Sequence, residues 1–496
     1  MARPLARHSS LRVSILTLAL VAAACGDEGD EAPPSLSVET PEGLRAALEQ
    51  ARSGDVITLE GKAFEGNFVV PAGVTLDGDG ASFIATGAVF KLTGGQETPT
   101  RLTNLTIESR GVGILASGGG EVQIDNVAVA AITGVGVAAE ALDKLTMESV
   151  TLDGPIEEAD LPDIGGTIDG RQTAIAGLIV SGGAVELARV DVTDFAGFGA
   201  VLFEVQGSWS DSTVSGNVGT SVLIEASTLD MAGLTVQEAR AGQKLGDNFI
   251  SIGVVASAGS RLTSNDLQIL GGRGVGLLQD NAFGDHTDLT VRDNNDTGVW
   301  VQNALRDSDT TALRITGQAS EISNNKGVAV FARDVTGVLI ENASISNTRL
   351  QPQVVGLASI ADVGDGIQLV GTSGSVALRN LQIQANERVG LLLDGTSDEP
   401  GLQTAFDFDQ ITITPPEGEL ADEVFGFLTQ NGAPERDTLL DGLTVSVELS
   451  TRDIENTRTL DVTETTDIPS AGLIGENGLI GENGQVGPEG LIGENG

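Results

Sequence analysis

The sequence predicts an all-β solenoid, in which short strands stack as successive coils, and three observations support this. One pattern recurs along the chain: an apolar strand ends at a corner rich in Asn and small residues, and a Gly then opens a second apolar strand. Related strands recur at a nearly constant spacing, and the composition suits a narrow aliphatic interior. A fixed repeat of this kind is typical of solenoids. Copies of the pattern lie at 214–224, 291–301, 322–331 and 383–393.

The spacing of one recurring strand, of the form Asn-Leu-Thr-Ile, gives the length of a coil. Asn104 and Asn126 open two copies that lie 22 residues apart, and Asp266 and Asp288 open two more at the same spacing. The copies together predict about 11–12 coils, which form a rod about 55 Å long at about 4.8 Å per coil. Like residues should then align between coils, so that Asn corners form amide ladders and Ile and Val form interior columns.

The composition fits stacked short strands and excludes one class of partner. The chain has 496 residues with 66 Gly, no Tyr and only 3% aromatic residues. Its formal net charge of -43 argues against nucleic acid, because phosphate binding needs clustered Lys and Arg. The acidity has two interpretations, solubility in a salty environment or bound divalent cations.

The N-terminus has the parts of a secretory signal peptide. Arg residues stand at positions 3, 7 and 12, an apolar run follows at 13–24, and small residues precede Cys25, the only cysteine. The apolar run is too short for a membrane span. We therefore expect residues 1–24 to be a signal peptide that directs the chain across the inner membrane.

The segment Val21-Ala-Ala-Ala-Cys25-Gly26 resembles the lipobox of bacterial lipoproteins. The resemblance implies that Cys25 is lipidated, that the chain is cut before it, and that the protein is anchored in the outer membrane or at the cell surface. Several acyl chains together anchor a protein strongly. The alternative is that Cys25 simply precedes an ordinary cleavage site. Residues 25–36 are acidic and rich in Pro, which indicates a solvated tether.

A short amphipathic helix is expected next, before the first strand. Thr40 is a favourable N-cap, Pro41 suits the first helical turn, and Gly54 follows the last turn. Its apolar side should cover the open end of the solenoid, whose strand edges would otherwise be unpaired.

Three strands after this helix carry a resemblance to a known family. They are Gly54-Asp-Val-Ile-Thr-Leu59, Gly66-Asn-Phe-Val-Val70 and Gly73-Val-Thr-Leu-Asp-Gly78. This stretch resembles the start of pectate-lyase-like proteins, which are right-handed parallel β-helices. With the repeats included, the resemblance implies that fold over residues 37–450.

Six changes in the repeat spacing predict loops inserted into coils, and loops on a rigid scaffold are where binding tends to occur. Residues 451–471 are expected to form a C-terminal cap or linker. The predicted insertions lie at 155–172, 239–247, 303–312, 348–365, 395–405 and 415–437.

The last segment, residues 472–496, has Gly at every third position and contains Leu-Ile-Gly-Glu-Asn-Gly three times. It has too little Pro for a collagen triple helix. Two readings remain, a mostly disordered tail or a segment for self-association or partner docking. Apolar residues recur with a six-residue period at Ile474, Ile480, Val486 and Ile492.

The enzyme motifs of this fold family are not evident in the sequence. Polygalacturonase-type hydrolases carry Gly-His-Gly and Arg-x-Lys elements, but this chain has only His8 and His286, and no Lys follows an Arg by two positions. Pectin esterases and several uronate epimerases use Tyr-containing signatures, and this chain has no Tyr. Function therefore has to be argued from individual side chains.

The strongest residual cluster of chemical groups lies between positions 280 and 309. We consider Asp288, His286 and Arg292 as candidate catalytic residues, and Asp266, Asp285 and Asp288 as candidate Ca²⁺ ligands. Stacked carboxylates about 5 Å apart repel unless a proton or a hard cation lies between them. Ca²⁺ with a nearby Arg would resemble the strategy of pectate lyases. The alternatives are solvated turn residues for the Asp side chains and an exposed loop position for His286.

The two tryptophans are candidates for stacking on sugar rings. Trp300 lies between Val299 and Val301, so it should point to the opposite face of its strand, which favours an exposed ring. Trp209 would serve in the same way if it faces outward.

Three functions remain open from the sequence. The first is a lipid-anchored, non-catalytic cell-surface scaffold that binds a polysaccharide or another envelope component. The second is a Ca²⁺-dependent polysaccharide lyase, or another carbohydrate-active enzyme with a divergent site. The third is a structural protein that assembles through its Gly-rich tail.

Overall fold

The computed structural model shows a right-handed parallel β-helix, the hand that connections between parallel strands almost always take. The predicted signal peptide, tether and Gly-rich tail, and with them Cys25, lie outside the described residues. The described residues are 38–131, 134–154, 174–240, 243–245, 248–304, 311–350, 363–395, 404–417, 424–431, 433–434, 439, 443–445 and 450–451.

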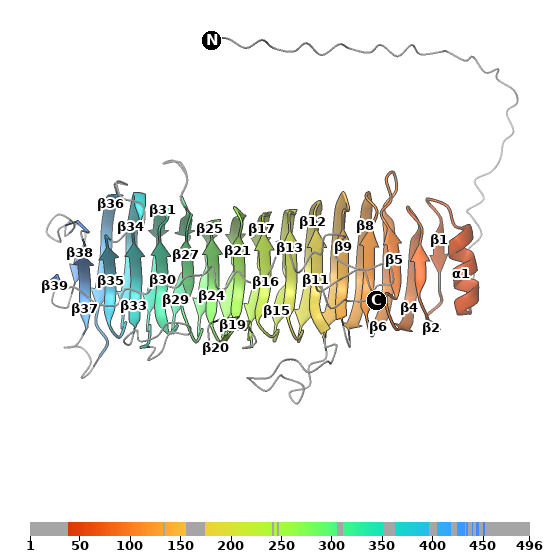
Figure 1. Ribbon diagram of the computed structural model, residues 1–496, viewed down its shortest axis with the longest axis horizontal. Helices are drawn as coiled ribbons and strands as arrows, with labels where there is room; N and C mark the ends of the chain where they lie inside the picture. Colours follow the sequence, from red (N-terminus) through yellow and green to blue (C-terminus); the bar gives the residue numbers. More distant parts are fainter. Residues whose placement is uncertain are drawn as a thin grey trace, which may run out of the picture. The chain divides into compact units, whose positions relative to one another are not determined.

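The coils stack through two long parallel sheets (Figure 1). Sheet B has 15 strands, more than the 11–12 coils expected, because the coils at the two ends and two interior coils, at Asp211 and Ala319, lack the Asn-Leu-Thr-Ile signature. Its strands are β3 (Phe68–Val70), β5 (Phe90–Thr93), β7 (Val112–Ser117), β9 (Gly134–Glu140), β11 (Ala174–Ser181), β13 (Phe198–Phe203), β16 (Thr220–Glu225), β21 (Ile252–Ser257), β24 (Val275–Asp280), β27 (Val299–Gln302), β30 (Gly327–Arg333), β33 (Gly364–Val370), β35 (Val389–Asp394), β37 (Phe425–Gln430) and β39 (Ser450–Thr451).

Sheet A has 22 strands and supplies the other two sides of each coil. Gln243–Leu245 (β19) and Asn248–Ile250 (β20) form a separate antiparallel hairpin. The strands of sheet A are β1 (Val56–Thr58), β2 (Ala63–Glu65), β4 (Thr75–Ala85), β6 (Thr100–Ser109), β8 (Glu121–Ala131), β10 (Lys144–Asp153), β12 (Ala184–Thr193), β14 (Gln206–Ser210), β15 (Thr213–Ser215), β17 (Thr228–Ala232), β18 (Thr235–Gln237), β22 (Arg261–Asn265), β23 (Gln268–Leu270), β25 (Phe283–Thr287), β26 (Thr290–Arg292), β28 (Leu313–Thr316), β29 (Ser320–Ser323), β31 (Thr336–Glu341), β32 (Ala343–Ser346), β34 (Ser373–Gln384), β36 (Thr404–Thr414) and β38 (Leu443–Val445).

Sheet A bends once in every coil. The bend explains why the recurring strand motif begins with Asn or Asp. Asn104, Asn126, Asp266 and Asp288 all have φ between 52° and 56°. Asn and Asp tolerate this left-handed conformation better than most residues. We call the part of sheet A before the bend segment A1 (for example β22 and β25) and the part after it segment A2 (for example β23 and β26).

The predicted Asn ladders are present both on the outer surface of the solenoid and in its interior. Outside, Asn126 Nδ2 donates to Asn104 Oδ1 of the preceding coil at 2.8 Å. Inside, a buried Asn accepts with Oδ1 a bond from a backbone N–H of the preceding coil, at 2.9–3.1 Å. These bonds satisfy backbone groups that the corners leave without a strand partner. The inner Asn residues are Asn217, Asn294, Asn325 and Asn386.

Helix α1 (Pro41–Gln50) closes the first coil, as predicted (Figure 1). Thr40 Oγ1 accepts a bond from the Gly43 N–H at 3.0 Å, which is the expected N-cap. Leu44 and Leu48 are buried and join the solenoid core. The helix therefore shields the end of the interior from water.

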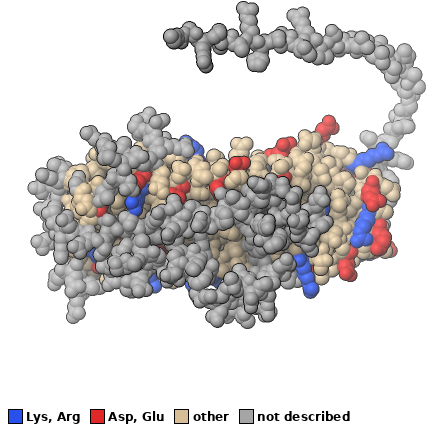
Figure 2. Space-filling view, in the orientation of Figure 1, with Lys and Arg blue, Asp and Glu red and all other residues tan. Residues whose placement is uncertain are grey.

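Both signs of charge lie close together around this end of the molecule (Figure 2). Arg45 lies 3.6 Å from Glu42, and Lys62 lies 2.9 Å from Glu39. These ion pairs are exposed, so each contributes little to stability, about 0–1 kcal/mol.

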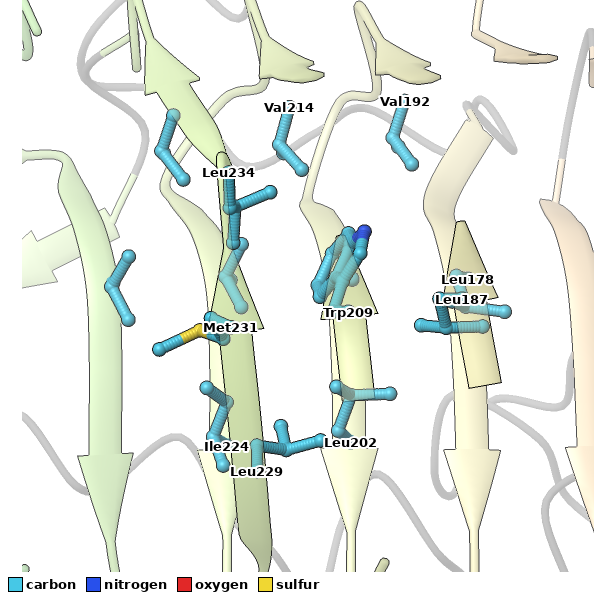
Figure 3. Close-up of a cluster of buried hydrophobic side chains, with 14 of the residues drawn as sticks. Leu178, Leu187, Val192, Leu202, Trp209, Val214, Ile224, Leu229, Met231 and Leu234 are labelled. Atoms are coloured by element: carbon cyan, nitrogen blue, oxygen red, sulfur yellow. The ribbon is translucent and has the colours of Figure 1, made fainter. Parts of the chain in front are cut away.

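The interior is a continuous column of mostly aliphatic side chains from all three sides of the coil (Figure 3). The 22-residue register holds where it was read from the sequence: Gln268 pairs with Thr290, and Leu105 pairs with Val127. Each coil buries the side chains of its neighbours, so stability accumulates coil by coil.

Candidate binding face

The two acidic candidates at the bend, Asp266 and Asp288, occupy equivalent positions in adjacent coils, as the register predicted. Their carboxylates, however, bind different groups. Asp266 Oδ1 accepts a bond from Gln268 Nε2 at 3.0 Å. Asp288 Oδ1 accepts bonds from the backbone N–H groups of Gln318 and Ala319, at 2.8 and 2.9 Å. Asp288 therefore holds a turn of the next coil.

The other members of the predicted cluster point to different sides of the wall. Asp285 lies on the outer face of segment A1, 3.4 Å from Arg314. Arg292 lies on the outer face of segment A2, and His286 points into the interior. The structure thus does not bring Asp288, His286 and Arg292 together. Among the described residues, no group of three or more His, Cys, Asp or Glu side chains could hold a metal ion.

The expectation that His286 is an exposed loop residue is wrong. It lies in strand β25 and is fully buried, with Nδ1 2.7 Å from Ser264 Oγ of the preceding coil. Gly284 makes room for it, because a Cβ there would lie 2.2 Å from Gln279 Nε2 and 2.3 Å from His286 Nε2. Burial away from water lowers the pKa of His286 to about 4, so the imidazole is neutral at pH 7.

Neither tryptophan offers an exposed ring. Trp209 is fully buried in the interior column between Leu187 and Met231 (Figure 3). Trp300 points outward from sheet B, as the alternation predicted, but its ring is only 1% exposed and packs edge-on against Phe331 at 4.9 Å. Stacking of sugars on either ring as it stands is therefore excluded.

The outer face of segment A2 carries the most regular set of polar side chains in the described structure. From β15 to β36, two residues of each coil, two positions apart in the strand, point outward and align with their counterparts in the neighbouring coils. Most are Ser, Thr or Gln, and we call this set the hydroxyl–amide array. Its members are Thr213, Ser215, Thr235, Gln237, Gln268, Thr290, Ser323, Ser344, Ser346, Gln382, Gln384, Thr412 and Thr414.

The array has the geometry of a flat grid. Adjacent coils lie about 4.8 Å apart, and residues i and i+2 of one strand lie about 6.6 Å apart. Nearly all of its side chains are exposed or half-buried; Ser323 is the buried exception. The polar groups also organise one another, since Gln384 Nε2 donates to Gln382 Oε1 at 3.2 Å. In the sequence, this signal lies in the third residue of Asn-Leu-Thr-Ile, whereas the predicted coil register depends on the apolar positions of the motif.

The array is poor in charge within a very acidic protein. Over the eight coils from β15 to β36, the charged residues in its two rows are Arg292 and Glu321, and the apolar exception is Leu270. Ser323 Oγ donates to Glu321 Oε1 at 2.5 Å. The rows therefore present paired donors and acceptors and carry few charges of their own, although carboxylates such as Asp266 border them at the bend.

The inserted segments border sheet B. Insertions 155–172, 239–247 and 348–365 each lie between a strand of segment A2 and the next strand of sheet B. The predicted insertion 415–437 is wrong in part, because strand β37 of sheet B lies within it; the extra residues before β37 take the same place between segment A2 and sheet B. Insertions 303–312 and 395–405 lie between a strand of sheet B and the next strand of segment A1. Most of their residues lie outside the described ranges, but their connections leave the bend between A1 and A2 free of large insertions.

A small pocket of about 190 Å³ lies at the C-terminal end, where sheet B meets segment A1. Gly371, Asp394 and Phe406 contribute to its lining. Asp394 accepts amide bonds from Gln430 Nε2 at 2.7 Å and Asn431 Nδ2 at 3.1 Å. These donors hold the carboxylate in place as part of the wall.

The part of the chain that the structure describes contains no helix long and apolar enough to span a bilayer. No family model matches the sequence, and no curated protein matches it.

Solved structures with a similar fold include the A-module of a mannuronan C-5 epimerase from Azotobacter vinelandii, at 14% identity and TM-score 0.35 over 83% of this chain and 98% of that chain. A structure of the Vag8–C1 inhibitor complex matches at 11% identity and TM-score 0.46, over 84% and 99%. The catalytic unit of a GH87 α-1,3-glucanase from Streptomyces thermodiastaticus matches at 13% and TM-score 0.31, over 88% and 72%. At these identities the likeness concerns the fold alone.

Proposed function

We propose that this chain is a surface scaffold that binds a neutral polysaccharide on the hydroxyl–amide array. The observation that carries the proposal is the register of that array, which repeats donors and acceptors along one side of the solenoid. A polysaccharide is itself a repeating chain of hydroxyl groups, so many equivalent hydrogen bonds can form at once. Each bond is weak, about 1 kcal/mol net, and the repeated bonds together provide affinity.

The charge of the protein favours a neutral ligand over an acidic one. The chain carries a formal charge of -43, and like charges repel a polyanion before contact. The array offers one cation, Arg292, and one anion, Glu321, within its rows. Neutral glycans therefore fit this face better than alginate or pectate do.

The proposal predicts that removing hydroxyl groups from the array weakens glycan binding. In the triple variant Thr235→Val, Thr290→Val and Thr412→Val, each side chain keeps its shape and its preference for a strand but loses its hydrogen bonds. At about 1 kcal/mol each, the three losses should weaken binding about 100-fold. Retention on insoluble neutral glucans, chitin and xylan, compared with alginate and pectate, measures this effect.

Thr263→Val is the matched control, because Thr263 is exposed on segment A1 in the same solenoid. Its binding should equal that of the parent protein. Equal binding by the triple variant would contradict the proposed face. Cleavage of an acidic glycan that requires Ca²⁺ would instead support the lyase that the sequence left open.

We also propose that the scaffold is attached to the membrane through a lipid on Cys25. The support is the lipobox-like segment 21–26. Cys25→Ser should move the protein from the membrane fraction to the soluble fraction and abolish labelling with a fatty acid. Ser35→Ala, in the tether, should change neither property. Continued membrane retention of the Cys25→Ser protein would refute the anchor.

A further inference from the structure

The outer face of sheet B carries a row of apolar side chains that runs along the solenoid. One residue per coil points outward at the centre of each strand and aligns with its counterparts. We call this row the apolar stripe. It consists of Ala138, Ile179, Val201, Leu223, Val255, Leu278, Trp300, Phe331, Gln368, Leu392 and Leu428.

The stripe is buried although it lies on the outside of the wall. Its hydrophobic members are at most 4% exposed. In the first coil, Val69 occupies the same row and is 59% exposed. Apart from hairpin β19–β20, every described strand belongs to one of the two long sheets, and α1 lies at the N-terminal end. A hairpin of two three-residue strands is far too short to cover a stripe about 50 Å long.

The stripe also contains a polar group that requires a partner. Gln368 is fully buried, and neither its Nε2 nor its Oε1 has a hydrogen-bond partner. A buried amide without partners costs about 1–3 kcal/mol. Backbone N–H and C=O groups of an extended peptide on the stripe would satisfy both atoms.

The end of the described chain lies on this same row. In β39, Ser450 pairs with Leu428, so the chain leaves the solenoid from sheet B at one end of the stripe. Residues 452–496 follow, and they reach up to about 150 Å when extended. This segment is long enough to run back along the whole stripe.

The period of the C-terminal segment matches the period of the solenoid. Ile474, Ile480, Val486 and Ile492 recur every six residues. Six residues of a polyproline II-like chain, with three residues per turn and about 3.1 Å per residue, span about 19 Å, and four stacked coils also span about 19 Å. Successive apolar residues of the segment would therefore meet equivalent positions of the stripe.

We propose that the C-terminal segment, residues 452–496, lies along the apolar stripe of its own solenoid, with its six-residue apolar repeat facing sheet B. The segment shields a surface that would otherwise associate with other apolar surfaces. Glu476, Glu482 and Glu494 each follow an apolar residue of the repeat by two positions, so with three residues per turn they point away from the face that meets the sheet. This inference is independent of glycan binding, because the hydroxyl–amide array lies on segment A2.

Trp300 reports directly on this contact. The chain has two tryptophans, so in a Trp209→Phe background Trp300 is the only one. Ending this chain at Thr451 should shift the emission of Trp300 to longer wavelength and raise its quenching by acrylamide several-fold. The far-ultraviolet circular dichroism spectrum should remain that of a β-protein, and the mass should remain that of one chain.

Two full-length variants separate apolar docking from a general effect of truncation. Replacing Ile474, Ile480, Val486 and Ile492 with Ser should expose Trp300 as truncation does. Replacing Glu476, Glu482, Glu489 and Glu494 with Gln should leave it protected. A protected Trp300 in the truncated chain would overturn the proposal. Protection that depends on protein concentration and accompanies a dimer mass would also overturn it, and would make a second copy the occupant.

Discussion

Truncating Trp209 to alanine should lower the free energy of unfolding by about 3–5 kcal/mol, the usual cost of removing a buried aromatic ring. The ring is fully buried between Leu187 and Met231 of the adjacent coils. Its neighbours come from separate strands whose backbone bonds fix their spacing, so the surrounding coils cannot close the cavity. Urea unfolding followed by circular dichroism in the far ultraviolet measures the loss.

Trp209→Phe is the matched variant, because it keeps an aromatic ring in the same column. It should lose clearly less stability than Trp209→Ala, also because the buried Nε1 of Trp209 has no hydrogen-bond partner to lose. Glycan binding should be unchanged in both variants once they are folded. A loss below about 1 kcal/mol for Trp209→Ala would show that the ring is not part of the packed interior.

The fold could be predicted from the sequence because the solenoid repeats its own signals. Thr40 and Pro41 mark the start of α1, and the 22-residue spacing of Asp266 and Asp288 gives the register of whole coils. Asp266 and Asp288 also mark the bend of sheet A, and the repeat pattern did not indicate that the sheet bends there. A left-handed corner and the start of a strand look alike in sequence when Asn or Asp occupies the position.

The interior position of His286 was harder to predict, because strand β25 does not show the usual alternation of apolar and polar residues. In β25 the inward positions are Gly284 and His286, neither of which is a typical core residue. The cluster of Asp around them resembled a loop. The available signal was the spacing, since His286 stands 22 residues after Ser264, with which it pairs.

The environment of Trp300 shows a different limit. Alternation correctly gave the side of the strand, with Val299 and Val301 inside. Whether an outward side chain is exposed depends on what covers the sheet, and that can come from a segment distant in sequence. Periodicity within one strand carries no information about such a contact.

The burial of His286 makes the stability of the solenoid depend on pH. The pKa of His286 is lowered by burial to about 4, from 6.5 in an unfolded chain. Between these values the unfolded chain binds a proton that the folded chain does not. Stability should therefore be full above about pH 6.5 and fall as the pH decreases to about 4. The total loss is about 3 kcal/mol, at about 1.4 kcal/mol per pH unit.

The variant His286→Leu isolates this effect, because it removes the only histidine between residues 38 and 451. Carboxyl groups also titrate near pH 4, among them Asp194, whose pKa is raised chiefly by burial, but both proteins contain them. The difference in unfolding free energy between parent and variant should therefore change by about 3 kcal/mol between pH 7 and pH 4. Leucine also removes the hydrogen-bond partner of Ser264 Oγ, so the variant should be the less stable protein at pH 7. A difference that stays constant with pH would mean that the imidazole reaches water, and that the interior opens at this coil.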